Sequence, residues 1–263
     1  MLRQRIISAC IAVPLLFAVL FVLPPGAARA VIAAVMLTAA WEWSGLLLAG
    51  GRAARLAYVV LFGALQAAVL SLPDGPLTLQ LVMSLALAWW GLALLWVTLY
   101  PTPVPLLLRW VAGMLVMIPA WLALDFLYRL EPALLLFMLV IVWAADIGAY
   151  FAGKRWGRVK LAPGISPGKT WEGVLGGMLL VLALAAVRGL VAGNNLGVLL
   201  PFCLAVALLS IVGDLTVSIF KRNAGLKDSG KLFPGHGGLL DRIDSVTAAA
   251  PLFALGVSWA GLR

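Results

Sequence analysis

Residues 211–245 read IVGDLTVSIFKRNAGLKDSGKLFPGHGGLLDRIDS, and this stretch decides the fold class. Its beginning is apolar enough to be buried in a membrane, although it contains Asp214. It then carries three further aspartates, five basic residues, the one histidine of the chain and a glycine-rich turn. Carboxylates beside lipid are costly and are kept where they bind ions or substrates. The stretch therefore predicts a membrane-embedded helix that ends in a functional polar loop.

The composition of the whole chain agrees with a membrane protein. Of its 263 residues, 64% are hydrophobic and only 11% are charged, which is outside the range of soluble globular proteins. Because roughly 20 apolar residues cross a bilayer, we expect an all-α integral membrane protein, a polytopic bundle of about nine transmembrane helices. The expected spans are 6–23, 28–49, 56–72, 77–99, 105–127, 132–153, 173–192, 196–221 and 244–261.

The distribution of lysine and arginine predicts the orientation. With the N-terminus in the cytoplasm, fifteen of the 19 basic residues fall on the cytoplasmic side. The other four are Arg29, Arg129, Arg188 and Arg263. This asymmetry follows the positive-inside rule, and it predicts a multi-pass protein of the cytoplasmic (inner) membrane with its active site facing the cytosol.

We expect residues 1–263 to form a single membrane domain. Residues 1–130 would be N-terminal helices that serve as a scaffold or for lipid access. Residues 131–263 would be catalytic helices with two cytoplasmic loops, 154–172 and 222–243. The net charge of +9 does not indicate nucleic-acid binding, because the basic residues lie at span ends without a nucleic-acid motif. Cys10 and Cys203 lie in apolar runs and are expected to be packing residues.

The aspartates around the last two spans suggest a metal site. Asp214, Ser218 and Lys221 are spaced i, i+4, i+7 and share one helix face, whereas Asp241 and Asp244 are spaced i, i+3. Converging carboxylates repel each other unless a cation lies between them. Mg²⁺ suits them, since it takes carboxylate, phosphate and water oxygens. The alternative is that Asp241 and Asp244 only favour a helix N-terminus and pair with a neighbouring arginine.

The segment between these aspartates is suited to an anion. Three glycines around His236, among them Gly237 and Gly238, allow backbone N–H groups to approach a phosphate, although a plain tight turn is an equal alternative. His236 could bind a phosphate or be structural. A triphosphate also needs several positive partners, and the candidates are Lys221, Arg222, Lys227, Lys231 and Arg242, with Lys231 the first to be assigned only a topological role.

The other cytoplasmic loop offers a second phosphate-binding region. Ser166, Lys169 and Thr170 precede the seventh span, where free N–H groups and the helix dipole favour an anion. The alternative is an N-cap, with Glu172 capping the same turn. A nucleotide P-loop is excluded, because the glycine spacing is wrong and no strand is expected before it. Asp146, just before this loop, is a second-tier candidate together with Glu172.

The pattern S-x-x-K-R-x(4)-K-D-x(5)-P-G-H-G-G-x-x-D-R-x-D, residues 218–244, resembles the signature of the phosphatidate cytidylyltransferases, the CDP-diacylglycerol synthases. The segments ADIGAYFAGKRWGR and LAPGISPGKTWEG resemble a second region of that family. Two positions depart from the family pattern. Gly168 stands where a lysine is usual, and Ile147 stands where a hydroxyl residue is usual.

The resemblance implies an integral membrane enzyme that joins CTP and phosphatidic acid into CDP-diacylglycerol and pyrophosphate. It also implies Mg²⁺ with a neighbouring K⁺, and a homodimer in contact with membrane lipids. By matching position, Asp214, Asp241 and Asp244 would be the metal-associated acids, with Lys221 also catalytic. The residues implied to line the substrate site are Ser166, Lys169, Thr170, Ser218, Arg222, Lys227, Asp228, His236, Gly237, Gly238 and Arg242.

The mechanism follows from the reactants. The phosphate of phosphatidic acid is already anionic at neutral pH and needs no general base, since the second pKa of a phosphomonoester is about 6. It needs charge neutralisation and alignment against the α-phosphoryl group of CTP.

The competing class is a cation-coupled membrane transporter, because intramembrane acids also mark ion pathways. A carrier would place its acids near mid-membrane in broken helices, whereas these gather at one face. Two further acids lie in spans. For Glu42, in the second span, a bond within the bundle and a role at the site both stay open, whereas Asp125, near the outer end of the fifth span, is expected to be interfacial.

Overall fold

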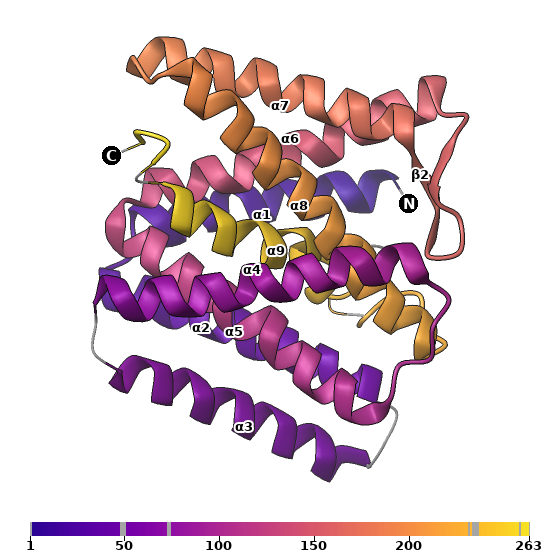
Figure 1. The fold of residues 1–263 in the computed structure, drawn as a ribbon. Coiled ribbons are helices and arrows are strands. Elements are labelled where there is room, and N and C mark those ends of the chain that lie inside the picture. The colour runs from indigo at the N-terminus through magenta and orange to yellow at the C-terminus, as the bar shows by residue number, and fades with distance from the viewer. Residues whose placement is uncertain are drawn as a thin grey trace.

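The computed structural model describes residues 2–47, 51–72, 75–230, 232, 237–257 and 259–262, with side chains from residue 11 onward. Within these residues the chain forms nine α-helices, one 3₁₀ turn and a two-stranded hairpin (Figure 1). The elements are α1 (Leu2–Phe21), α2 (Pro25–Ser44), η1 (Gly45–Leu47), α3 (Gly51–Ser71), α4 (Pro76–Leu99), α5 (Leu106–Leu130), α6 (Pro132–Trp156), β1 (Lys160–Ala162), β2 (Ser166–Thr170), α7 (Trp171–Ala192), α8 (Leu196–Asn223) and α9 (Leu240–Gly256).

The prediction of an all-α polytopic membrane protein is confirmed, and each expected span overlaps one helix. Among the described residues, seven helices, α2 to α8, are long and apolar enough to cross a membrane. In α1 the structure describes side chains only over Ile11–Phe21, which is too short to be counted among these helices, and α9 has 17 residues. The count of nine spans and the side of the N-terminus therefore stay predictions.

Proline and glycine set the helix boundaries as the sequence indicated. Pro25, Pro76 and Pro132 each lie in the first turn of a helix, where a missing N–H costs nothing. Between α7 and α8, Gly193 adopts a left-handed conformation and Asn195 caps the next helix by accepting the Gly197 N–H.

One element was not expected. β1 and β2 pair in antiparallel fashion between α6 and α7, with Lys160 opposite Thr170. The expectation that no strand precedes the seventh span was therefore wrong. The hairpin is held at its base, where the Trp171 N–H donates to the carbonyl of Val159. It carries Lys169 on a paired strand rather than on a free loop.

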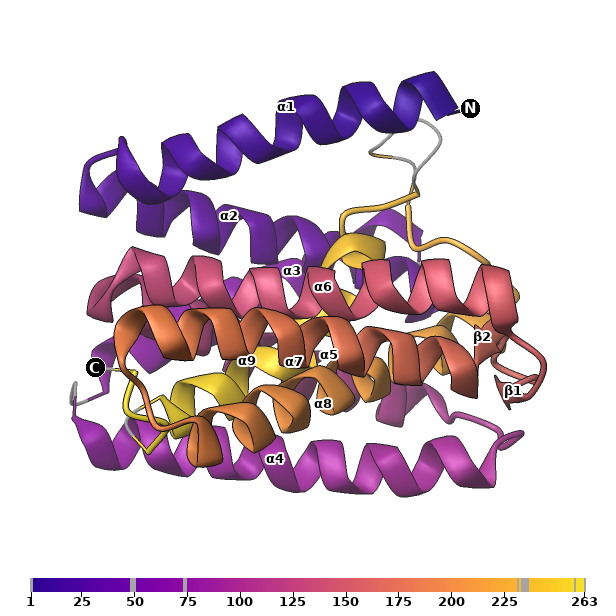
Figure 2. The same ribbon diagram turned by 90° about the horizontal axis from the view of Figure 1, so that it is seen from above.

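Small residues let α6 and α7 pack closely. A Cβ on Gly177 would lie 2.5 Å from the carbonyl oxygen of Ala145, and a Cβ on Gly148 would lie 2.7 Å from the carbonyl oxygen of Gly176. Such close backbone approach is typical of membrane helix pairs. In contrast, α9 packs against α4, α5, α6 and α8, and most of its residues are buried (Figure 2).

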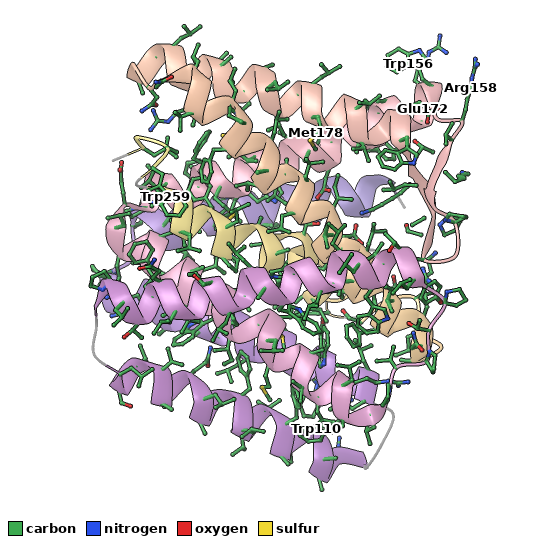
Figure 3. The ribbon with its side chains drawn as sticks, viewed as in Figure 1. Trp110, Trp156, Arg158, Glu172, Met178 and Trp259 are labelled. Atoms are coloured by element: carbon green, nitrogen blue, oxygen red, sulfur yellow. The ribbon has the colours of Figure 1, made fainter. Side chains whose placement is uncertain are left out.

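The bundle has two chemically different ends. The hairpin end, on the right in Figure 1, carries the β1–β2 hairpin and the C-terminal end of α8, and α9 begins near the middle of the view and runs away from this end. Trp156, Arg158 and Glu172 lie at this end, and Trp259 lies toward the opposite one, the far end (Figure 3). The polar residues of both sequence motifs that the structure describes fall at the hairpin end.

Candidate active site

The structure brings the two long loops of the sequence together at the hairpin end. The Arg222 guanidinium, near the end of α8, donates from Nε to the carbonyl of Ile165 in the hairpin turn at 3.2 Å. Lys169 of β2 reaches α8 as well, where its Nζ lies 2.7 Å from Oδ2 of Asp214. The residues that we assign to the active site come from α6, α8, α9 and the hairpin.

One part of this cluster is open. The side chains of Lys169 and Asp214 keep 25% and 27% of their surface exposed although they form an ion pair. Ser218 donates its hydroxyl to Oδ1 of Asp214 at 3.2 Å. Asp146 on α6 is exposed and close enough to Lys169, Asp214 and Arg242 to interact with their charges. We call Asp146, Lys169 and Asp214 the open half of the site, because a substrate can reach them.

The other part is closed. The Lys221 ammonium lies 2.8 Å from Oδ1 of Asp241 and 3.7 Å from Oδ2 of Asp244. These three side chains are only 7% to 9% exposed. Asp244 and Asp214 are close enough to repel each other, so the two halves form one cluster. Lys221, Asp241 and Asp244 make up the closed half, in which one ammonium group faces two carboxyl groups.

Asp241 also holds the glycine-rich turn. Its Oδ2 accepts the backbone N–H groups of Ser229 and Gly238, each at 2.9 Å. Gly237 has a φ of +82°, and a Cβ there would lie 2.7 Å from the same Oδ2. Burial would raise the pKa of Asp241, but the Lys221 ammonium and the two N–H donors outweigh it and hold the pKa below its usual value.

The predicted metal ligands do not form a complete metal site by themselves. Over the part of the chain that the structure describes, no three side chains of His, Cys, Asp or Glu come together in a way that could hold an ion. Ammonium groups lie against Asp214, Asp241 and Asp244 instead. The donor chemistry, carboxylate oxygen, still fits Mg²⁺, which in nucleotide enzymes takes one or two carboxylates and completes its shell with phosphates and water.

Two of the predicted residues around the hairpin, Thr170 and Glu172, have structural contacts. Thr170 is buried, and its hydroxyl accepts the Gly173 N–H at 3.2 Å, so the N-cap alternative describes Thr170. The Glu172 carboxylate accepts the Val159 N–H at 3.1 and 3.2 Å and ties α7 to the base of the hairpin. Ser166 is half-buried at the start of β2.

The remaining candidates lie at the end of α8, on the segment that follows it and in the first turn of α9. Arg222 is engaged with two carbonyl oxygens, those of Ile165 and Leu226. Lys227 and Asp228 are exposed, as is Arg242. His236 lies outside the described residues, and so does Lys231.

The sequence left Glu42 unassigned, and the structure places it beside the site. Its carboxylate, at the end of α2, is 5% exposed and accepts hydrogen bonds from Ser229, Leu239 and Leu240. The sequence signal was an acid between two tryptophans near a span end. It did not show which distant segment that acid contacts.

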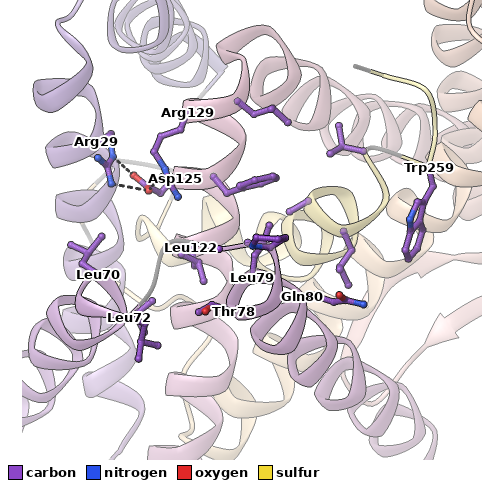
Figure 4. Close-up of a pocket in the computed structure, with 18 residues that line it drawn as sticks. Arg29, Leu70, Leu72, Thr78, Leu79, Gln80, Leu122, Asp125, Arg129 and Trp259 are labelled. Atoms are coloured by element: carbon purple, nitrogen blue, oxygen red, sulfur yellow. Dashed lines mark hydrogen bonds and ion pairs between the residues drawn. The ribbon is translucent and has the colours of Figure 1, made fainter.

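A cavity of about 920 Å³ lies at the far end, away from the cluster. Its polar lining includes Asp125, which accepts from Arg29 Nε at 2.6 Å and lies 3.1 Å from Arg129 Nε (Figure 4). Both guanidinium groups are thus engaged by one buried carboxylate. Arg29 is thirteen residues before Glu42 on α2, roughly 20 Å along the helix axis, so this cavity is separate from the site.

Comparison with known proteins identifies the family. A model of the cytidylyltransferase family matches residues 3–259. A phosphatidate cytidylyltransferase of Pseudomonas aeruginosa is 45% identical, with 99% of this chain and 98% of the relative covered. One of Haemophilus influenzae is 38% identical over 97% of this chain and 98% of the relative. One of Staphylococcus aureus is 46% identical over 45% of this chain and 46% of the relative.

These matches do not support the transporter alternative. The acids that we assign to the site also lie at one end of the bundle, whereas a carrier would place them near mid-membrane. The match extends over nearly the whole chain and includes every element of the charged cluster. The chain is a nucleotidyltransferase, and it belongs to the cytidylyltransferase family.

Proposed function

We propose that this protein transfers the cytidylyl group of CTP to phosphatidic acid. A phosphate oxygen of phosphatidic acid attacks the α-phosphorus of CTP and forms the new P–O bond. The bond between the α-phosphorus and the bridging oxygen breaks, and that oxygen leaves with pyrophosphate. The names of the full-length relatives support this pair of substrates. The observation that carries the proposal on the structure is the charged cluster with one open half.

In this proposal the open half receives the phosphates. Lys169 lies on the hairpin with a quarter of its side chain exposed, so its ammonium can exchange Asp214 for a phosphate oxygen. Arg242 is exposed on the first turn of α9 and is close enough to Asp146 to interact with its charge. Cations on both sides lower the repulsion between two anionic reactants and align them.

The closed half serves as the fixed support. The Lys221 side chain is 7% exposed and its ammonium contacts both Asp241 and Asp244, so it is proposed to act by holding these acids in place. Mg²⁺, carried in with CTP, would be held by Asp214 and Asp244 with phosphate oxygens, with Asp241 and a K⁺ ion beside it. When bound, Mg²⁺ would supply charge neutralisation for the departing pyrophosphate.

Phosphatidic acid is proposed to enter from the lipid side of α6. Asp146 is followed on this helix by Ile147, Tyr150 and Phe151, which are 51%, 59% and 65% exposed. An exposed apolar surface therefore lies next to Asp146 of the open half. The acyl chains can stay in the bilayer while the phosphate reaches Lys169, which fits a reaction between a lipid and a water-soluble nucleotide.

The hairpin end is proposed to face the cytosol, where CTP is available. Arg55 and Arg109 lie at this end, where Arg55 contacts Ser44 and Arg109 contacts the carbonyl of Asn223. Arg29, Arg129 and Arg188 lie toward the far end. This asymmetry supports an inner-membrane protein with a cytoplasmic N-terminus. A homodimer, implied by the family resemblance, is part of the proposal and is tested by light scattering in detergent.

The function is tested with purified protein in detergent that is given labelled CTP and phosphatidic acid, with Mg²⁺ or with a chelator. We expect CDP-diacylglycerol and pyrophosphate in equal amounts, only with Mg²⁺. The Asp214→Asn variant, purified in the same way, is the inactive control. If a folded, monodisperse wild-type protein forms neither product, the proposal is wrong.

A further inference from the structure

The Glu42 carboxylate joins the N-terminal half of the chain to the segment that carries Asp241. Its Oε2 accepts the Ser229 hydroxyl and the Leu240 N–H, each at 2.8 Å, and its Oε1 accepts the Leu239 N–H at 3.0 Å. The first donor lies before the glycine-rich turn and the other two lie after it. One side chain of α2 therefore holds both ends of the turn.

The backbone around this carboxylate is shaped to fit it. A Cβ on Gly230 would collide with Oε1 of Glu42, and a Cβ on Gly238 would collide with Oε2 and with the Ser229 hydroxyl. For Gly230, the three nearest atoms all belong to Glu42. At both positions an added Cβ would therefore have to push aside an acid that comes from another helix.

Glu42 also acts as the cap of α9. The N–H groups of Leu239 and Leu240 are at the start of this helix, where unpaired donors and the helix dipole attract a negative charge. No side chain of the N-cap residue itself supplies this bond. A residue nearly 200 positions earlier in the chain supplies it instead.

Glu42 and Asp241 share a partner. Ser229 donates its hydroxyl to Glu42 and its backbone N–H to Asp241, and the Gly238–Leu240 strip likewise donates to both carboxylates. A shift of the turn away from Glu42 therefore also moves the donors that hold Asp241 against Lys221. Glu42 itself touches no residue of the open half in any of these bonds.

We propose that Glu42 is a positioning residue of the transfer reaction, which fixes the first turn of α9 and thereby the Lys221–Asp241 pair. This inference rests on the proposed function. The rest of α9 is held by its buried residues between α4, α5, α6 and α8. Loss of Glu42 therefore displaces the first turn of α9 and leaves the bundle folded.

The test compares Glu42→Gln and Glu42→Ala with the wild type and with Glu131→Gln, the same change at an exposed glutamate of the far end. Activity is measured per folded molecule, well below the melting temperature. Removal of a group that orients a catalytic acid costs about 10- to 100-fold in activity. We expect kcat to fall by about this factor in Glu42→Ala and by less in Glu42→Gln, which keeps one acceptor oxygen. KM for CTP should change little, and Glu131→Gln should match the wild type.

A double-mutant cycle tests the contact directly. Gly230→Ala should lower kcat in the wild-type background, because its Cβ pushes the carboxylate away. In the Glu42→Ala background the same change should have little further effect, since the colliding atoms are gone. Additive losses would contradict the proposed contact.

Two results would overturn the inference: kcat per folded molecule within twofold of the wild type in both Glu42 variants, or a loss that only follows the loss of folded protein. Hydrogen exchange over residues 226–245 gives a readout without catalysis, and it should be faster in Glu42→Ala. If the wild type forms no CDP-diacylglycerol, the proposed function fails, and hydrogen exchange alone then decides whether Glu42 holds this segment.

Discussion

Lys169 on the hairpin and Asp214 on α8 form an ion pair, with 2.7 Å between Nζ and Oδ2, and both side chains remain about one quarter exposed. Lys221 and Asp241 are equally close, at 2.8 Å, but almost fully buried. The same kind of ion pair thus occurs once in an accessible place and once in a buried place. We therefore expect the loss of each pair to affect stability differently.

Removal of Lys221 should destabilise the protein. Lys221→Met leaves Asp241 and Asp244 buried without the ammonium group that contacts both, and loss of one partner from a buried pair costs about 3 to 5 kcal/mol. Thermal unfolding in detergent measures this loss. Lys169→Met is the matched control, because its partner Asp214 is accessible to water. A melting temperature that falls equally in both variants would contradict the division into open and closed halves.

Removal of the carboxylate of Asp214 should abolish turnover and leave the fold intact. Asp214→Asn keeps the size of the side chain and the contact with Ser218 but removes the charge that faces Lys169. We expect a loss of activity on the order of 1000-fold, as for the removal of a preorganised electrostatic group. Initial rates of CDP-diacylglycerol formation test it. Activity above a tenth of the wild type would rule out a central role for Asp214.

Acid should weaken the closed half. Because the folded pKa of Asp241 lies below its usual value, Asp241 contributes stability above the unfolded pKa of about 3.9. That contribution is lost as the pH falls through the folded pKa. The Asp241→Asn variant should therefore lose less stability than the wild type between neutral and strongly acidic pH. Melting temperatures recorded across this range measure the difference, and parallel curves would be inconsistent with it.

Packing of α6 against α7 should tolerate no added carbon atom at Gly177. A Cβ there would lie 2.5 Å from the backbone oxygen of Ala145, so Gly177→Ala forces the helices apart. We expect a loss of about 1 to 3 kcal/mol and reduced activity, since the hairpin with Lys169 sits at the end of this pair. Gly91→Ala in α4 is the control, because nothing lies within 4 Å of its added Cβ. Equal melting temperatures for the two variants would exclude tight packing at Gly177.

The helices could be predicted from the sequence because each apolar run is bounded by proline, glycine or charge. The segment around Pro101 separates α4 from α5, although it carries no charge, and Pro132 begins α6. The short hairpin was missed, because three- and five-residue strands carry too little periodicity to be recognised beside a basic loop.

The site could be predicted as a set of residues but not as an arrangement. Lys169, Asp214, Lys221, Asp241 and Asp244 were all proposed from the sequence, and the structure places them in one cluster. Their division into an accessible and a buried part depends on how α8, α9 and the hairpin pack. The contacts of Glu42 could not be predicted from the sequence, since its hydrogen-bond partners are nearly 200 residues away and are mostly backbone N–H groups.

The bond from α2 to the start of α9 has a practical consequence for protein engineering. A split of the chain near residue 130 would separate Glu42 from the turn that its carboxylate holds, and α4 and α5 from the helix packed between them. A chimaera that combines helices of two relatives would have to take α2 and the glycine turn from the same parent. The two halves of the chain therefore depend on each other's contacts, even though the recognisable motifs lie in the second half.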